Sequence, residues 1–211
     1  VAVKVLRPGI ERAFRRDIDA FHFAAEWIEI LSPASRRLRP TDVVSHFESV
    51  VMGELDLRLE SAAASEFANN TRDDPGFAVP PPVWELSSRR VMTLDWAEGI
   101  ALGDVAALRA AGHDLHALAE RVLQLFLSHA LRDGFFHADM HQGNMKVSAT
   151  GDIIAYDFGI MGQIDEYTRR VYAEILIGFI RRDYRRIAEV HFEAGYVPRD
   201  RDIDEFARAL R

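Results

Sequence analysis

The stretch His137-Ala138-Asp139-Met140-His141-Gln142-Gly143-Asn144 and the later tripeptide Asp157-Phe158-Gly159 decide the fold. The first stretch places an aspartate and an asparagine five positions apart, between an expected long helix and an expected β-hairpin. The tripeptide follows directly after a strand-like run. A third motif, Val1-Ala2-Val3-Lys4, puts a lysine at the end of a strand that we expect to be buried. The order of the three motifs predicts that basic, acidic and amide groups act together on one ligand.

Phosphoryl transfer from ATP depends more on the placement of charge than on covalent chemistry. Lys4 is the candidate for holding the α- and β-phosphates, and Asp139 for accepting or orienting the proton of an acceptor hydroxyl. Asn144 and Asp157 are candidate ligands for divalent cations, Mg²⁺ or alternatively Mn²⁺. This chain order is the one that kinases use. It predicts an α+β, helix-rich, protein-kinase-like bilobal fold with a truncated N-lobe.

Each motif also has a plainer interpretation. A strand lysine such as Lys4 is usually a surface residue, and an Asp-Phe-Gly tripeptide often only makes a turn. His137, Asp139 and His141 alternate, so on an extended segment they could bind a transition metal. That interpretation leaves Asn144, Lys4 and the Asp-Phe-Gly turn unexplained. We therefore expect His137 to be a structural histidine of the loop and His141 to be partly exposed.

Composition sets few limits on function. The 211 residues are 48% hydrophobic and 28% charged, with a formal net charge of −7, so nothing draws the chain toward nucleic acid. It contains no cysteine, and no apolar run approaches the roughly 18 residues of a membrane helix. Because it opens on a strand-like run without methionine, we expect a soluble fragment of a longer protein, truncated also at its C-terminus.

Hydrophobic periodicity and turn residues predict the order of the elements. A strand is expected over Val1–Leu6 and a helix over Ile10–Leu31. A second long helix, capped by Thr41-Asp42, is expected to continue through Leu59. The later expected elements are two strands over Val83–Leu86 and Arg90–Leu94, a helix ended by Gly134, a hairpin of Met145–Val147 with Ile153–Tyr156, and helices from Asp165 onward.

This pattern suggests three parts. Residues 1–94 are expected to form a partial N-lobe with inserted helices, lacking its first strands and its nucleotide loop. Residues 95–99 are the expected hinge, where Asp95 and Ala97 are candidate nucleotide contacts. Residues 100–211 are expected to form a helical C-lobe that carries the catalytic loop.

Several motifs together are similar to the UbiB/AarF family of atypical kinases. They are Val1-Ala2-Val3-Lys4-Val5 with Arg7-Pro8-Gly9, Glu54-Leu55-Asp56 with Glu60, Phe135-Phe136-His137-Ala138-Asp139, and Asp157-Phe158-Gly159. The resemblance covers essentially the whole chain. It implies a protein-kinase-like fold and an ATPase or atypical kinase tied to ubiquinone biosynthesis.

The resemblance also implies roles for particular residues. Glu60 would be the ion-pair partner of Lys4, and Glu54 and Asp56 would form the Glu-x-Asp motif that contacts an N-terminal extension. Phe158 and Gly159 would support the loop of Asp157, as His137 supports that of Asp139. On one ideal helix Glu54 and Asp56 diverge by about 200°. Both therefore point into one cleft only if the helix is distorted there.

The sequence also departs from the family pattern. Met140 and Gln142 stand where members often carry prolines, and no Ala-Pro-Glu segment follows Asp157. The alanine-rich nucleotide loop and the Lys-x-Gly-Gln extension would precede Val1, so we expect the excised piece to turn over ATP poorly.

Two alternatives stay open. One is a small-molecule kinase of the aminoglycoside or choline type, against which the inserted helix and Glu54-x-Asp56 argue. The other is a pseudokinase scaffold that binds nucleotide or lipid. The expected partners are nucleotide and a prenyl-quinone precursor lipid or quinone-synthesis enzymes. The resemblance places the full-length protein at the cytoplasmic face of the bacterial inner membrane, with peripheral association.

Overall fold

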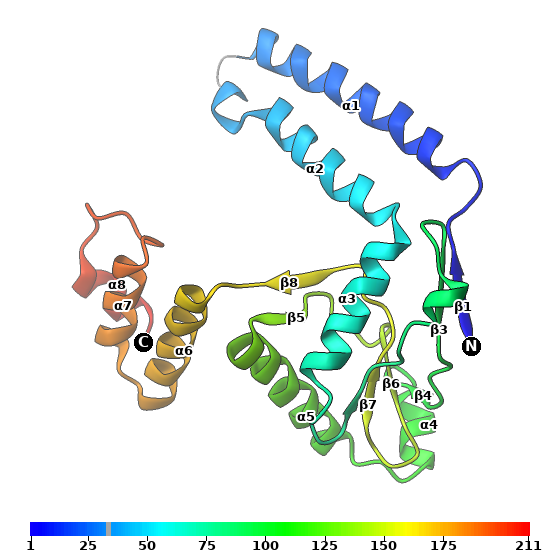
Figure 1. The fold of residues 1–211 in the computed structure, drawn as a ribbon. Helices are drawn as coiled ribbons and strands as arrows, with labels where there is room; N and C mark the ends of the chain where they lie inside the picture. The colour runs from blue at the N-terminus through cyan, green and yellow to red at the C-terminus, as the bar shows by residue number, and fades with distance from the viewer. Residues whose placement is uncertain (33–34) are drawn as a thin grey trace. The chain divides into compact units, whose positions relative to one another are not determined.

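A computed structural model describes residues 1–32 and 35–211 of the chain (Figure 1). These residues form two compact units. The first contains Val1–Gly103 and Gln142–Gly159, and the second contains Asp104–His141 and Ile160–Arg211. The segment Gln142–Gly159, which the sequence suggested for the C-lobe, thus folds with the first unit. The expected hinge at 95–99 stays a prediction.

The first unit begins with a two-stranded antiparallel ribbon. Strand β1 (Ala2–Val5) pairs with β3 (Val91–Leu94), and the register sets Lys4 opposite Met92. Three of the four β1 residues are exposed, whereas Met92, Thr93 and Leu94 are buried. The prediction that Lys4 ends a buried strand is therefore wrong. Lys4 lies on the exposed strand β1, and the paired strand β3 contributes the buried apolar side chains.

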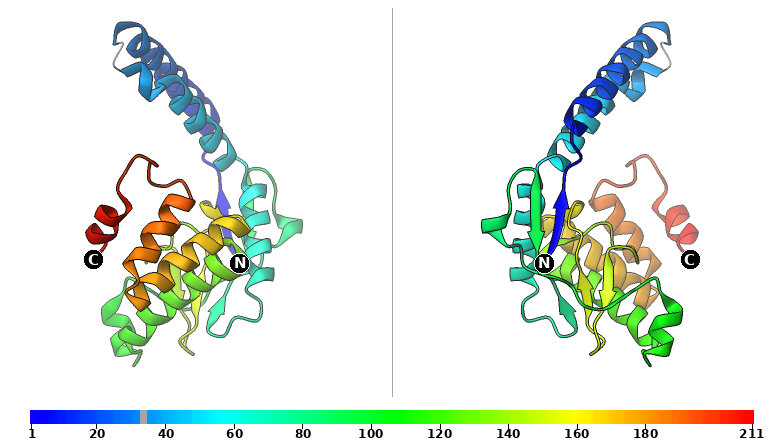
Figure 2. Two further views of the ribbon diagram at one scale, coloured as in Figure 1. Left: turned by 90° about the vertical axis from the view of Figure 1, so that its left-hand side faces the viewer. Right: turned by 90° about the vertical axis from the view of Figure 1, so that its right-hand side faces the viewer.

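A helical hairpin follows β1. Helix α1 (Ile10–Leu31) has the predicted bounds, and α2 (Pro40–Glu54) lies beside it after a short 3₁₀ turn, Ser35–Leu38 (Figures 1 and 2). The rings of Phe21 and Phe47 join the two helices edge to face, 6.2 Å apart. The predicted Thr41-Asp42 cap is wrong. Arg39 is the N-cap and Pro40 occupies the first turn, while Thr41 binds the carboxylate of Glu29 through its backbone N–H and its hydroxyl.

The second predicted helix is in fact two helices. Helix α2 ends at Glu54, and α3 (Leu57–Asn70) begins after a break at Leu55-Asp56. Asp56 is the N-cap of α3, because its carboxylate accepts the N–H of Arg58 at 3.1 Å. The N–H of Leu57 donates to the carbonyl of Arg89 at 2.9 Å. The start of α3 is thereby tied to the turn that precedes β3.

A four-stranded sheet completes the first unit. Its order is β2 (Phe77–Ala78), β7 (Ile153–Ala155), β6 (Met145–Val147) and β4 (Ile100–Ala101). The β6–β7 hairpin matches its prediction, since Met145 pairs with Ala155. The predicted strand Val83–Leu86 is wrong, because Trp84–Leu86 is a 3₁₀ turn that closes against β3.

The second unit is mainly helical. Its elements are α4 (Val105–Ala110), α5 (Leu115–Ser128), a π-turn (His129–Asp133), β5 (Phe135–His137), β8 (Met161–Gln163), α6 (Glu166–Arg181), α7 (Tyr184–Glu193) and α8 (Ile203–Ala209). Gly134, at φ 71°, ends the π-turn, and Asp165 caps α6 as predicted. Within the part of the chain that the structure describes, none of the helices combines the length and apolar character that crossing a bilayer requires.

Candidate active site

The candidate site in the first unit is built around the ammonium group of Lys4. Its Nζ donates to both carboxylate oxygens of Glu60, at 2.7 and 2.9 Å. Glu60 comes from the first turn of α3 and is 9% exposed, so its charge is shielded from water. Burial lowers the pKa of Lys4, but the Glu60 hydrogen bond and the charges of Glu60 and Asp157 outweigh it, so the pKa is raised overall. Lys4 is therefore a fixed cation.

Asp157 is a second acidic neighbour of the same ammonium group. Its Oδ1 is 3.6 Å from Lys4 Nζ, and its side chain is 42% exposed. The next residue, Phe158, is buried and packs edge to face on Phe67 of α3, with ring centroids 6.2 Å apart. The N–H of Gly159 donates to Asp157 Oδ1 at 3.2 Å. The buried phenylalanine anchors the loop while the carboxylate stays accessible.

The break before α3 gives the two acids of the Glu-x-Asp motif different surroundings. A Cβ added to Gly159 would lie 3.2 Å from Glu54 Oε2, so Glu54 reaches the Asp157 loop. Burial, and then the charge of Glu60, raises the pKa of Glu54. Asp56 instead binds Arg58, whose hydrogen bonds lower the pKa of Asp56 to about 2. The helix is thus broken between Glu54 and Asp56, as the prediction required for both acids to point into one cleft. Asp56 nevertheless binds Arg58 rather than pointing toward the Asp157 loop.

Asn144 is held at the open end of the β6–β7 hairpin. The residue is 9% exposed, and its carbonyl accepts the N–H of Tyr156 at 3.2 Å. Because the strands are antiparallel, this pairing sets Gly143 opposite Asp157 and brings Asn144 to the same end as the carboxylate.

The donors at this end suit a magnesium ion that is shared with phosphates. No group of three or more His, Cys, Asp and Glu side chains that could hold a metal ion is found among residues 1–32 and 35–211. Mg²⁺ commonly binds through one or two protein oxygens together with substrate phosphates and water, rather than in an all-protein cage. The Asp157 carboxylate and the Asn144 amide fit that smaller donor set.

Lys146, which sequence reasoning missed, fixes the predicted hinge. Its Nζ donates to the carbonyl of Ala97 at 2.9 Å and lies 4.7 Å from the ring centroid of Trp96 and 5.7 Å from that of Tyr156. Cation–π contacts of this kind add to the hydrogen bond. Nothing in a Met-Lys-Val strand signals such a contact, because it depends on a turn 49 residues away. The other candidate hinge contact, Asp95, donates its N–H to the carbonyl of Pro81.

The aspartate of the catalytic motif belongs to the second unit. Its backbone N–H donates to Nδ1 of His137 at 3.1 Å, and His137 is 1% exposed, which agrees with a structural role for this histidine. Nε2 of His141 lies 3.4 Å from Asp139 Oδ2, and His141 is exposed as expected. Lys4, Glu60, Asn144 and Asp157 all lie in the first unit, so the convergence of Asp139 with them stays a prediction.

Comparison with known proteins now identifies the family. The sequence profile of the ABC1 atypical kinase-like domain matches residues 1–191. The chain belongs to the ABC1 atypical kinase-like family. The resemblance to UbiB/AarF proteins and the α+β kinase-like fold, both predicted from the sequence, are confirmed.

Two relatives place this ABC1 domain more closely. It is 40% identical over 215 residues to a probable protein kinase UbiB of Cronobacter sakazakii, covering 100% of this chain and 39% of that protein. It also resembles the structure of a complex of Rv3197 with erythromycin from Mycobacterium tuberculosis, with a TM-score of 0.75 and 25% identity, over 98% of this chain and 52% of that one. The domain thus spans about two fifths of the curated relative that it matches.

Proposed function

We propose that this ABC1 domain binds ATP with Mg²⁺, or alternatively Mn²⁺, and transfers or hydrolyses the γ-phosphoryl group. The observation that carries the proposal is the pair of carboxylates beside the Lys4 ammonium, Glu60 at 2.7 Å and Asp157 at 3.6 Å. A lysine fixed in this way presents a positive charge without moving, and phosphoryl transfer depends on such preplaced charge.

Each polar group has a task in this proposal. Lys4 binds the α- and β-phosphate oxygens, and Glu60 sets its position. Asp157 and Asn144 hold the divalent cation, which neutralises charge on the transferred group when it is bound. Asp139 orients the acceptor hydroxyl or a water molecule and takes its proton. Asp95 and Ala97 are the backbone positions that we propose for the nucleobase.

The relative named as a probable protein kinase UbiB supports a setting for this chemistry. We propose that the full-length protein acts in ubiquinone biosynthesis at the cytoplasmic face of the bacterial inner membrane. Its partners there would be a prenyl-quinone precursor lipid or quinone-synthesis enzymes. Fractionating cells that produce the full-length protein tests the location, and recovery only in the soluble fraction would contradict it.

A thermal-shift titration of the full-length protein with Mg·ATP tests nucleotide binding. A ligand at a hundred times its dissociation constant stabilises a protein by about 2.7 kcal/mol. Asp157→Asn should abolish most of that stabilisation, because it removes a cation ligand. Asp152→Asn is the matched control, since the Asp152 carboxylate accepts hydrogen bonds from Ser148 and Thr150 in the hairpin turn. Equal stabilisation of both variants and the wild type would argue strongly against the proposal.

Complementation separates catalysis from scaffolding. Asp139→Asn keeps the size of the side chain and removes its capacity to take a proton. In a strain that lacks the gene, the full-length Asp139→Asn protein should bind Mg·ATP but fail to restore quinone production. Full restoration would instead favour a pseudokinase scaffold.

A further inference from the structure

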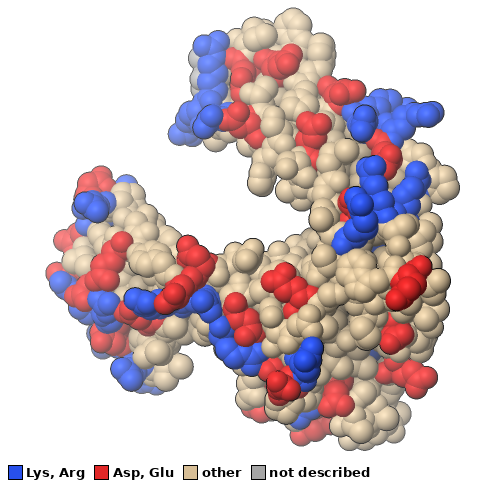
Figure 3. All heavy atoms as spheres, viewed as in Figure 1, with Lys and Arg blue, Asp and Glu red and all other residues tan. Residues whose placement is uncertain are grey.

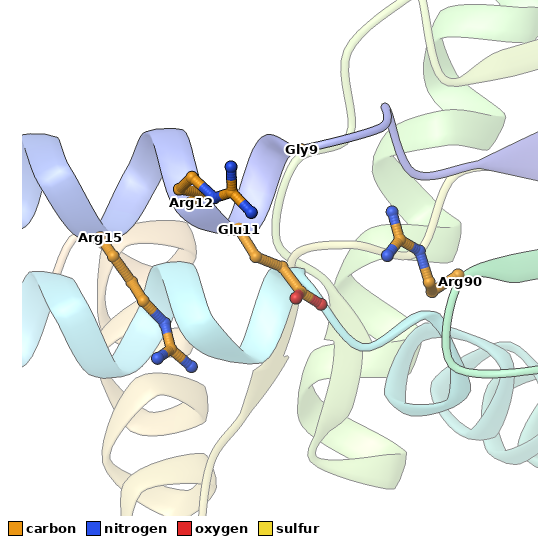
Figure 4. A pocket seen from close by; sticks show the side chains of 5 residues that line it. All are labelled: Gly9, Glu11, Arg12, Arg15 and Arg90. Carbon is orange, nitrogen blue, oxygen red and sulfur yellow. The ribbon is translucent and has the colours of Figure 1, made fainter.

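A cavity of about 480 Å³ lies at the start of α1, apart from the candidate active site. Five residues line it: Gly9, Glu11, Arg12, Arg15 and Arg90 (Figure 4). Gly9 is the N-cap of α1, and Glu11, Arg12 and Arg15 lie in its first turns. Arg90 comes from the turn before β3. The wall therefore carries three guanidinium groups and one carboxylate.

The single carboxylate of the wall is already neutralised. Glu11 Oε1 lies 3.2 Å from Arg89, which does not line the cavity. By contrast, nowhere in residues 1–32 and 35–211 does a side chain form an ion pair or hydrogen bond with the guanidinium groups of Arg12, Arg15 or Arg90. Figure 3 shows basic side chains gathered over this end of α1. The cavity thus presents three positive charges without internal partners.

The backbone fixes where these charges lie. Arg12 and Arg15 are three residues apart on α1 and so share one side of the helix. Arg90 is held against the strand ribbon, because its carbonyl accepts the N–H of Leu6 at 3.0 Å. Gly9 is the N-cap of α1 and, at φ 76°, offers no side chain to the first turn. The positive end of this helix therefore adds to the charge of the arginines.

We propose that this pocket binds a phosphate-bearing ligand. The planar fork of arginine matches phosphate geometry, and charge-assisted hydrogen bonds of this type are among the strongest in proteins. The volume exceeds that of a single phosphate and falls in the range of small-ligand sites. The pocket is lined by other residues than the candidate active site, since neither Lys4 nor Asp157 is part of its wall. This proposal is independent of the ATP site.

Calorimetric titration of the full-length protein with inorganic pyrophosphate tests the pocket. The double variant Arg12→Gln/Arg15→Gln should weaken pyrophosphate binding by about tenfold or more. Arg16→Gln is the matched control for each single variant, Arg12→Gln and Arg15→Gln, because it removes one positive charge from the same helix outside the cavity. The side chains of Arg12, Arg15 and Arg16 are exposed, so the variants should keep the fold, which circular dichroism checks. Because Lys4 is itself proposed to bind phosphates, the titrations are repeated in the Lys4→Met background, where the loss caused by Arg12→Gln/Arg15→Gln should persist.

Vesicle sedimentation distinguishes a lipid phosphate from a soluble one. Vesicles of phosphatidylcholine with and without phosphatidic acid are incubated with the wild type and the double variant. Binding to phosphatidic acid that the double variant loses assigns the pocket to a lipid headgroup. Pyrophosphate binding without vesicle binding assigns it to a soluble phosphate compound. The proposal is overturned if neither probe binds, or if the double variant binds both as the wild type does.

Discussion

The carboxylate of Glu60 holds the ammonium of Lys4 through both of its oxygens, at 2.7 and 2.9 Å, although 56 residues separate them. The two residues differ in exposure, with 48% of the Lys4 side chain and 8% of the Glu60 side chain accessible. A pair of this kind contributes most by fixing the direction of the exposed partner. The Lys4 charge is directed toward Asp157, at the place where phosphates are proposed to bind.

Removing only the lysine should destabilise the protein more than removing both members of the pair. Lys4→Met leaves the Glu60 carboxylate buried without its cation. We expect a loss of about 1–2 kcal/mol of unfolding free energy, less than for a fully buried pair because Lys4 is half exposed. The double variant Lys4→Met/Glu60→Gln should recover part of that loss. Chemical denaturation of the wild type, the two single variants and the double variant gives the coupling energy of the pair. Strictly additive effects would show that the pair is not coupled.

The Lys4–Glu60 pair shows how far the sequence could lead. The candidate residues Lys4, Glu60, Asn144 and Asp157 were found from motif order and family resemblance, and the structure places them all in the first unit. The contact of Lys146 with Ala97 could not be found, because a strand lysine carries no sign of its tertiary partner. Motifs reveal groups that chemistry requires, whereas supporting contacts depend on the packing of distant segments.

Glu54 should destabilise the fold at neutral pH. Burial, and then the charge of Glu60, raises its pKa, so the folded chain binds this proton more tightly than the unfolded chain does. The unfolding free energy therefore falls as the pH rises from the ordinary value of 4.5 through the raised one, and this penalty remains at neutral pH. Glu54→Gln should raise the melting temperature at about pH 7 and have little effect at about pH 4.

Melting curves at several pH values check this, with Glu66→Gln on the exposed side of α3 as a control for the loss of one negative charge. A gain for Glu54→Gln that is the same at every pH, or that Glu66→Gln reproduces, would contradict the assignment.

Two helical glycines should respond in opposite ways to alanine. A Cβ at Gly178 of α6 would lie 2.5 Å from Cγ1 of Ile187, which is fully buried in α7. Gly178→Ala should therefore destabilise the second unit by about 1–3 kcal/mol. Gly53 of α2 has open space around it, so Gly53→Ala should stabilise α2 by about 0.5–1 kcal/mol. Hydrogen exchange of α6 and α7 in the full-length protein measures the effect of Gly178→Ala. If these helices were protected equally in Gly178→Ala and Gly53→Ala, the prediction would be contradicted.

Local sequence rules succeeded where one signal dominated and failed where signals competed. Helix Ile10–Leu31 was predicted with its true bounds, because its apolar spacing runs uninterrupted between two turns. The break at Leu55-Asp56 was missed because the apolar period continues across it. Asp56 nevertheless prefers to cap α3, and the carbonyl of Arg89 accepts the first N–H of that helix. The 3₁₀ turn Trp84–Leu86 was read as a strand, since three residues are too few to show a period.

Lys146 should matter for nucleotide affinity without touching phosphate. Its bond to the Ala97 carbonyl and its position over Trp96 fix the turn that we propose for the nucleobase. Lys146→Met removes the donor and the cation but keeps the aliphatic length, so the turn loses both restraints. We expect Mg·ATP to bind about tenfold more weakly, since one such hydrogen bond and one cation–π contact together contribute roughly 1.5 kcal/mol.

The conservative variant Lys146→Arg retains a donor and a cation and should keep most of that affinity. Pyrophosphate provides the internal control, because it has no base and the arginine pocket proposed for it does not include this turn, so its affinity should not change in either variant. Parallel titrations with Mg·ATP and with pyrophosphate measure both effects. Equal weakening of both ligands by Lys146→Met would mean that the residue acts on the fold as a whole rather than on the nucleobase turn.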